Sequence, residues 1–302
     1  MMRVIVDCDP GLGKKKSLTD VDDGLALFFM LNQPDLFEIE GITVTYGNTR
    51  VKTGYKLLKE YLQLTSRSNL PHYLGANSRE DLIKLTEASE FLISEVKDNP
   101  NEFTLLILGP LTNIATAIMK YPEFLDDLKE VIFMGGVIHP TSALSIGPTE
   151  TIQYSEFNFL NDPKATKLFI EAETKTPRIG LGLDVCCQIV FNRTHYEFIK
   201  ARETAISQYI VENIINWLNL WERTKIKGFY PFDTLVPIYL LKDELFKTSD
   251  FVLKVDTEGV PGKLSIVERD QTIVSKITYC MDFSSENSKT ECMDILLRGL
   301  TI

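Results

Sequence analysis

An aspartate cluster near the N-terminus is the densest group of side chains in this sequence that could do chemistry. The segments Asp7-Cys8-Asp9-Pro10-Gly11-Leu12 and Asp20-Val21-Asp22-Asp23 place five carboxylates within 17 residues. Carboxylates so close together repel one another unless a positive charge compensates them. A hard divalent cation such as calcium or magnesium could do so, because it prefers oxygen ligands of this kind. A solvated loop before a helix is the alternative, because a helix dipole favours anions at positions such as Asp22 and Asp23. The cluster alone leaves both interpretations open.

The segments that would position this cluster alternate between strand-like and helix-like patterns. We predict strands at residues 4–6, 38–44, 103–108, 131–134 and 178–183, and helices at residues 22–32, 51–62, 111–120 and 163–171. Several of these strands are apolar without alternation, as expected for strands that helices cover on both faces. This βαβ order predicts an α/β fold with a Rossmann-like, mainly parallel central sheet flanked by helices, in a single domain over residues 1–302.

A long helical region is predicted over residues 194–225. Its apolar residues recur every three or four positions, with one gap of seven between Ile199 and Ile206, and they form one buried stripe. The stripe includes Trp217 and Trp221, for which packing in the core is the favoured interpretation. Residues 13–21 and 137–152 are expected to be inserted loops, because Gly, Ser, Thr and Lys are frequent in them.

Several candidate binding residues come just after a predicted strand. In open α/β sheets, ligands bind beyond the carboxyl ends of the strands. The residues in such positions are Asp7, Asp9, Tyr46, Gly47, Asn48, Leu108 and Gly135. We therefore expect one site at this edge of the sheet.

The composition argues against several classes of protein. The chain is 44% hydrophobic and carries a formal net charge of −10, whereas a nucleic-acid-binding surface requires clustered Lys and Arg. The five cysteines form no CxxC pair, which favours free thiols in a reducing compartment. No signal-peptide pattern is evident, and no apolar run approaches the roughly 18–20 residues needed to cross a bilayer. We expect a cytoplasmic protein with no nucleic-acid and no membrane partner.

From the aspartate cluster onward, the chain resembles the inosine-uridine-preferring nucleoside hydrolase family. The cluster is similar to that family's DxDPGxDD motif, here split by nine residues. The later similar segments are Ile42 to Asn48, Leu108 to Ala115, Phe133 to Gly136, Glu156 to Asn158 with Asp162-Pro163, Gly182 to Val185, Phe232-Asp233 and Gly262 to Leu264. Each segment alone is weakly specific. Together, in the order of the family, they span residues 4 to about 270 and make the resemblance specific.

The resemblance implies a nucleoside hydrolase-like catalytic domain that cleaves the N-glycosidic bond of a ribonucleoside to ribose and free base. It implies Ca²⁺ as the cofactor. Asp9, Asp23, the backbone carbonyl of Leu108 and Asp233 would hold this ion, and Asp9 would also be the general base toward water. Relatives form dimers or tetramers, so the resemblance further implies a homodimer or homotetramer.

The resemblance also places the substrate, a small-molecule nucleoside. Asp22, Asn48, Glu156 and Asn158 would bind the ribose hydroxyls, and Phe232 would contact the base. Hydrolysis of an N-glycosidic bond passes through an oxocarbenium-like state, in which positive charge develops on the ribose ring. A cation that chelates the ribose diol would lower the pKa of a water so that Asp9 can accept its proton, and the carboxylates would stabilise the developing charge.

The insertion of residues 13–21 departs from the family pattern. It carries Lys14-Lys15-Lys16 into the middle of the metal motif. If the insertion loops outward, Asp9 and Asp23 still converge, whereas an inward fold makes Asp20 a rival ligand. A surface loop is the favoured interpretation, because three lysines are costly to bury.

Histidines that protonate the leaving base in many relatives have no clear counterpart here. Phe232 and Cys186-Cys187 stand where relatives often have histidine, and His139 lies in a predicted loop from which it could approach the site. Purine-selective relatives instead hold the base between aromatic rings, which Phe229, Tyr230 and Phe232 could supply unless they pack in the core. We therefore expect a slight preference for purine nucleosides.

Two other functions remain open from the sequence. A catalytically weakened, metal-dependent ribose- or nucleoside-binding protein would explain the split motif and the missing histidines, although Asp9 argues against it because binding alone needs no base. The loop before Glu156 also lacks a ribose-binding asparagine, which Glu150 or Gln153 could replace. A DxD phosphatase built on Asp7 and Asp9 is the other alternative function. The segment at residues 134–136 does not supply the acidic pair that such a phosphatase needs.

Overall fold

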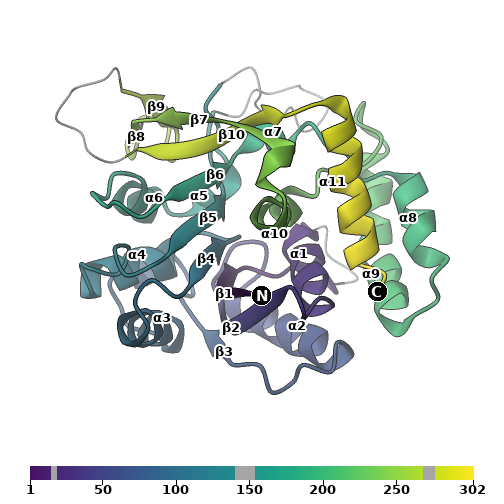
Figure 1. Cartoon of the computed structure of the whole chain (residues 1–302), viewed down its shortest axis with the longest axis horizontal. Helices are drawn as coiled ribbons and strands as arrows, with labels where there is room; N and C mark the ends of the chain where they lie inside the picture. Colours follow the sequence, from purple (N-terminus) through teal and green to yellow (C-terminus); the bar gives the residue numbers. More distant parts are fainter. Residues whose placement is uncertain (15–18, 140–153, 268–275) are drawn as a thin grey trace.

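An eight-stranded sheet forms the centre of the computed structural model, which describes residues 1–14, 19–139, 154–267 and 276–302 (Figure 1). Its strand order is β3-β2-β1-β4-β5-β6-β10-β7. The first seven strands in this order run parallel, and β7 pairs antiparallel with β10 at the edge. The strands are β1 (Met2–Cys8), β2 (Phe37–Val44), β3 (His72–Leu74), β4 (Thr104–Ile107), β5 (Glu130–Met134), β6 (Arg178–Leu181), β7 (Phe246–Phe251) and β10 (Ile277–Phe283). The predicted mainly parallel α/β sheet is confirmed.

Helices cover both faces of this sheet, because successive strand residues point to opposite sides. Val4 and Val6 of β1 lie in one buried cluster, whereas Ile5 lies in a second cluster. The first cluster includes residues of α1 (Asp22–Leu31), α2 (Val51–Leu64), α10 (Leu235–Leu241) and α11 (Glu286–Gly299). The second includes residues of α3 (Glu87–Asp98), α4 (Thr112–Lys120) and α6 (Pro163–Ile170). Burial on both faces explains why these strands are apolar without alternation.

The predicted elements of the first 180 residues have counterparts in the structure, with small shifts at their ends. The strand predicted at residues 178–183 stops at Leu181, and Leu183–Cys186 forms the short helix α7. The elements predicted from the sequence did not include β3, α3 or the elements that follow α10. These last include β10, which inserts beside β6, and the small β8 (Leu253–Val255) and β9 (Leu264–Ile266) sheet.

The long helical region predicted over residues 194–225 is interrupted in the structure. The structure has two helices, α8 (Arg193–Lys200) and α9 (Ala205–Trp221). Glu203 has a φ of 56°, which a continuing α-helix does not allow, and the side chain of Thr204 caps α9 by accepting a hydrogen bond from the main-chain N–H of Ser207. The gap of seven residues in the apolar pattern marks this break. Among the described residues, α9 is the longest helix, and none is long and apolar enough to cross a membrane.

Candidate active site

The end of β1 and the start of α1 form the floor of the site. The main-chain N–H of Asp9 donates a hydrogen bond to Asp23 Oδ1 at 2.8 Å. Asn48, which follows β2, donates from its side-chain amide to Asp23 Oδ2 at 2.9 Å and from its main-chain N–H to Asp9 Oδ2 at 2.5 Å. Because Asp9 and Asp23 stand on opposite sides of the insertion, the split motif still brings its two halves into contact.

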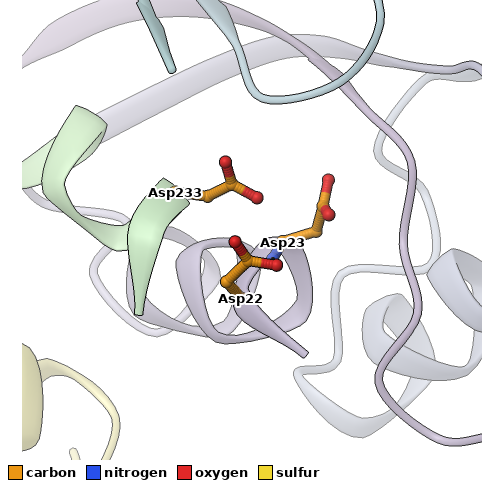
Figure 2. A group of neighbouring side chains, drawn as sticks. All are labelled: Asp22, Asp23 and Asp233. Atoms are coloured by element: carbon orange, nitrogen blue, oxygen red, sulfur yellow. The ribbon is translucent and has the colours of Figure 1, made fainter. Parts of the chain in front are cut away.

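Asp233 joins this group from more than two hundred residues away. It lies in the 3-10 turn η3 (Phe232–Thr234), which packs against α1. One carboxylate oxygen from each of Asp22, Asp23 and Asp233 lies within 4.8 Å of the other two. Figure 2 shows the three carboxylates close together at the start of the α1 helix. The structure therefore places Asp233 beside the N-terminal cluster, as the proposed metal site requires.

Unpaired oxygens show that the site fits a cation. Asp9 Oδ1 and Asp233 Oδ1 are buried and have no hydrogen-bond partner among the described residues. The carbonyl oxygen of Leu108 accepts a bond from Asn158 Nδ2 at 2.7 Å and keeps a second lone pair. Buried carboxylate oxygens without a partner are costly, and a hard cation with oxygen ligands removes that cost. The close group contains Asp22, which the resemblance gave to the ribose, and does not contain Asp9.

Burial raises the pKa of the carboxyl groups of Asp9, Asp22, Asp23 and Asp233. For Asp9 and Asp233 burial is the largest cause, and the negative charge of neighbouring aspartates adds to it. Burial, with the charge of Asp22, raises the pKa of Asp23 to about 7. A raised pKa favours the protonated form of a carboxyl, whereas a bound cation favours the ionised form, so binding of a cation would release protons.

Two glycines make room for the Asp9 carboxylate. Gly47 has a φ of +156°, and a Cβ at that residue would collide with Asp9 Oδ2. A Cβ at Gly109 would lie 2.7 Å from Asp9 Oδ1. Any side chain at these positions would displace the carboxylate, which explains why glycine follows β2 and β4 here.

A cavity of about 550 Å³ opens beside the carboxylates, at the carboxyl ends of the parallel strands. Seven of the residues proposed from the sequence line it: Asp22, Asn48, Leu108, Glu156, Asn158, Phe232 and Asp233. Asp9 and Asp23 lie behind this lining, 1% and 0% exposed. All nine proposed site residues are therefore in or directly behind one cavity.

The start of α5 (Phe157–Asn161) orients Glu156 and Asn158 toward this cavity. The carboxylate of Glu156 accepts hydrogen bonds from the main-chain N–H groups of Asn158 (2.7 Å), Phe159 (3.1 Å) and Gly136 (3.2 Å). Burial raises the pKa of Glu156 to about 7 even though these donors act against the shift. The helix start therefore holds both polar side chains in fixed positions.

Aromatic residues of α9 form another part of the cavity wall. Trp217, Trp221 and Phe232 all line it. The rings of Trp217 and Trp221 meet at 5.9 Å in an edge-on arrangement. Both tryptophans line the cavity, so the favoured interpretation, packing in the core, is incomplete. Trp221 also packs in the core and is 3% exposed, whereas Trp217 is only partly buried. The apolar stripe of α9 could not reveal this, because core and cavity lie on the same side of the helix.

The other aromatic candidates for base contact are not in the cavity wall. Phe229 is fully buried and stacks on Phe191 at 4.9 Å, so it is a core residue. Tyr230 is not among the cavity-lining residues, although its ring lies 5.6 Å from that of Phe232. Among the described lining residues there is no histidine: His139 is exposed, and its main-chain N–H donates to Asp184. Glu150 and Gln153 lie outside the described residues.

The insertion returns to the site at its C-terminal end. Lys14 is exposed, and residues 15–18 lie outside the described part of the chain. Thr19 and Asp20 line the cavity, and Asp20 Oδ1 accepts a hydrogen bond from the main-chain N–H of Val21. Asp20 is not one of the three residues whose oxygens lie within 4.8 Å of one another. The sequence suggested Asp20 only as a rival metal ligand, and its place on the cavity wall was not predicted.

The fold and the site together define an α/β protein with a buried acidic pocket at the carboxyl ends of its parallel strands. The model of the inosine-uridine preferring nucleoside hydrolases matches residues 4–295. The chain therefore belongs to this family, whose members are metal-dependent, and it is an enzyme that hydrolyses nucleosides.

Similar proteins support this assignment. A pyrimidine-specific ribonucleoside hydrolase of Shewanella oneidensis is 26% identical over 89% of this chain and 87% of its own length. A probable uridine nucleosidase of Arabidopsis thaliana is 23% identical, over 88% and 85%. Among solved structures, a plant nucleoside hydrolase has a TM-score of 0.84 at 20% identity, over 99% of both chains. A purine-preferring ribonucleoside hydrolase from Gardnerella vaginalis has a TM-score of 0.81 at 21% identity, also over 99% of both chains.

Proposed function

We propose that this enzyme hydrolyses the N-glycosidic bond of ribonucleosides with a calcium-activated water, with a slight preference for purine nucleosides. The observation that carries the proposal is the meeting of Asp9, Asp23 and Asp233 at one end of a cavity large enough for a nucleoside. Glycoside hydrolysis needs groups that activate water and stabilise positive charge on the sugar, and carboxylates do both.

Asp23 and Asp233, with Asp9 and the carbonyl of Leu108, would hold the Ca²⁺ ion. Bound there, the ion would supply a Lewis acid that lowers the pKa of water and fixes the ribose hydroxyls. Asp22 belongs to the same close carboxylate group and lines the cavity, so it can face both the ion and the sugar.

Asp9 is the proposed general base. Its Oδ2 is anchored by the main-chain N–H of Asn48, while its buried Oδ1 has no partner among the described residues. A carboxylate with one oxygen fixed and the other free is oriented to accept a proton from water. This arrangement argues against the alternative, a protein that only binds nucleosides, because binding does not require a base behind the cavity wall.

Asn48, Glu156 and Asn158 would bind the ribose hydroxyls, and Phe232 would contact the base. Glu156 and Asn158 are already fixed by the start of α5 and by the Leu108 carbonyl, so little entropy would be lost when they bind the sugar. The aromatic wall around Phe232 supports the slight purine preference, because a larger ring system buries more area on it.

The decisive assay measures reducing sugar released from inosine and from uridine, with and without added Ca²⁺. We expect release from both, faster with inosine, and loss of activity after chelation. Calcium binding without turnover of either nucleoside would favour the weakened binding protein instead. We also propose that the chain is a single catalytic domain that forms a homodimer or homotetramer. Light scattering of the same preparation would measure the oligomeric state. The five cysteines, none in a disulfide, support a cytoplasmic location.

A further inference from the structure

The cavity combines aromatic rings with carboxylates. Phe157, Trp217, Trp221 and Phe232 form its aromatic part, and Asp20, Asp22, Glu156 and Asp233 are its acidic residues. Among the lining residues that the structure describes there is no lysine, arginine or histidine. Asp9 and Asp23 lie behind the wall. The four aspartates that would surround a divalent ion, Asp9, Asp22, Asp23 and Asp233, carry four negative charges when ionised, which exceeds the two positive charges of the ion. A cleft of one charge sign with low-dielectric walls attracts ligands of the opposite sign.

A positively charged aromatic ligand would interact with both parts of this wall. The faces of indole and phenyl rings attract cations, tryptophan most strongly, and aromatic walls of this kind recognise ions without N–H donors. Trp217 is only partly buried and meets Trp221 edge-on at 5.9 Å, and the contacts continue through Tyr230 to Phe232. These rings therefore contact one another in series, partly through Tyr230, which does not line the cavity.

Among its described lining residues, the same cavity offers no histidine as an acid for the leaving base. None of the three histidines lines it: His72 packs against Tyr55, His195 packs against Phe191, and His139 is exposed. A neutral base that leaves ribose must accept a proton or depart as an anion. A base that carries a positive charge needs neither.

We propose that the preferred substrates of this enzyme are ribosides of positively charged bases, such as N7-alkylpurines or N-substituted pyridines. This inference rests on the proposed nucleoside hydrolysis and names its substrate class. Water adds to C1′ of the ribose as the C1′–N bond breaks, and the bond's electron pair stays on the base nitrogen. That electron pair neutralises the cationic ring. The products are ribose, a neutral base and one proton, which Asp9 takes from the water and passes to solvent.

A binding experiment tests the recognition step without turnover. The probes are the N1-methylnicotinamide cation and neutral nicotinamide, which have the same ring and differ in one methyl group and one charge. Titration calorimetry with the calcium-loaded enzyme should give a dissociation constant about tenfold lower for the cation, as expected for one good cation–π contact. Equal affinities would overturn the proposal.

Substitutions at Trp217 separate the aromatic contribution from the general negative charge. Trp217→Leu should remove most of the preference for the cation, whereas Trp217→Phe should keep most of it, because phenylalanine retains an aromatic face. Circular dichroism of both variants would verify that they are folded. A preference that survives in Trp217→Leu would show that the aromatic wall does not select the charge, and it would overturn the assignment.

A kinetic comparison connects recognition with the reaction and distinguishes the two proposals. We expect kcat/KM to be at least tenfold higher for 7-methylinosine than for inosine, and this ratio should fall in Trp217→Leu through a rise in KM. If the enzyme hydrolyses inosine with no advantage for 7-methylinosine, the substrate class is wrong and the proposed function stands. If it hydrolyses neither compound, the proposed function itself fails.

Discussion

The main-chain N–H of Asp9 donates a hydrogen bond to the carboxylate of Asp23 across an insertion that separates the two halves of the aspartate motif. The bond is 2.8 Å long and both residues are buried. The two halves of the motif are therefore in contact, and the end of the insertion adds Thr19 and Asp20 to the cavity wall.

Replacement of Asp9 should abolish hydrolysis and leave the fold intact. General-base catalysis contributes about 10²- to 10⁴-fold, so kcat of Asp9→Asn and Asp9→Ala should fall by at least that factor. The unpaired Oδ1 means that the structure loses no hydrogen bond at that atom. Reducing-sugar release from inosine measures the activity, and circular dichroism checks the fold. Near-normal activity in either variant would assign the base to another residue.

Calcium should stabilise the enzyme through Asp233. A ligand at 100 times its dissociation constant adds about 2.7 kcal/mol to the free energy of unfolding, which thermal unfolding detects readily. In Asp233→Asn, the calcium-dependent rise in Tm should be largely lost, because the carboxylate that faces Asp22 and Asp23 is gone. The exposed Asp35→Asn is the matched control and should respond like the unchanged enzyme. An equal rise in all three proteins would place the ion elsewhere.

Asp7 should make the metal-free enzyme less stable as the pH rises. Burial raises the pKa of Asp7 to about 7, although Asn113 and Thr43 donate hydrogen bonds to it. A carboxyl whose pKa is higher in the folded state than in the unfolded state, near 3.9, stabilises the fold fully below about pH 4. It loses that contribution as the pH rises through about 7.

Urea unfolding of the chelated enzyme between pH 4 and pH 8 tests this prediction. In Asp7→Asn the decline of the unfolding free energy should be shallower, by up to about 1.4 kcal/mol per pH unit, because one titrating group is removed. Asp35→Asn again serves as the control, since its side chain is exposed. Parallel curves for all three proteins would show that Asp7 does not carry the pH dependence.

Asp184 should hold the chain in place after β5. Its buried carboxylate accepts hydrogen bonds from the main-chain N–H groups of Ile138 (2.8 Å) and His139 (2.9 Å). Asp184→Ala leaves both donors without this partner and should lower the free energy of unfolding by about 1–3 kcal/mol. Asp184→Asn keeps one acceptor oxygen and should cost less. Urea unfolding measures both variants, and an unchanged midpoint for Asp184→Ala would show that other groups satisfy these donors.

Much of the fold could be predicted from local patterns. The apolar strands and the helices between them determined the parallel sheet, because each such strand needs cover on both faces. Residues such as Asn48 and Leu108 were placed at the site because they follow predicted strands. The C-terminal elements were missed. Strand β10 inserts between β6 and β7 through pairings distant in sequence, and no local pattern specifies such a partner.

The sequence by itself determined the chemical character of the site: aspartates, glycines and an asparagine at the carboxyl ends of parallel strands, in the order of a known family. The resemblance assigned Asp233 to the same ion as Asp23, and the tertiary structure shows that η3 brings it against Asp22 and Asp23. Only the tertiary structure decided that Trp217 lines the cavity. The physical reason is that periodicity in the sequence shows which side of a helix is apolar. Whether that side meets the core or a cavity depends on packing between elements far apart in the chain.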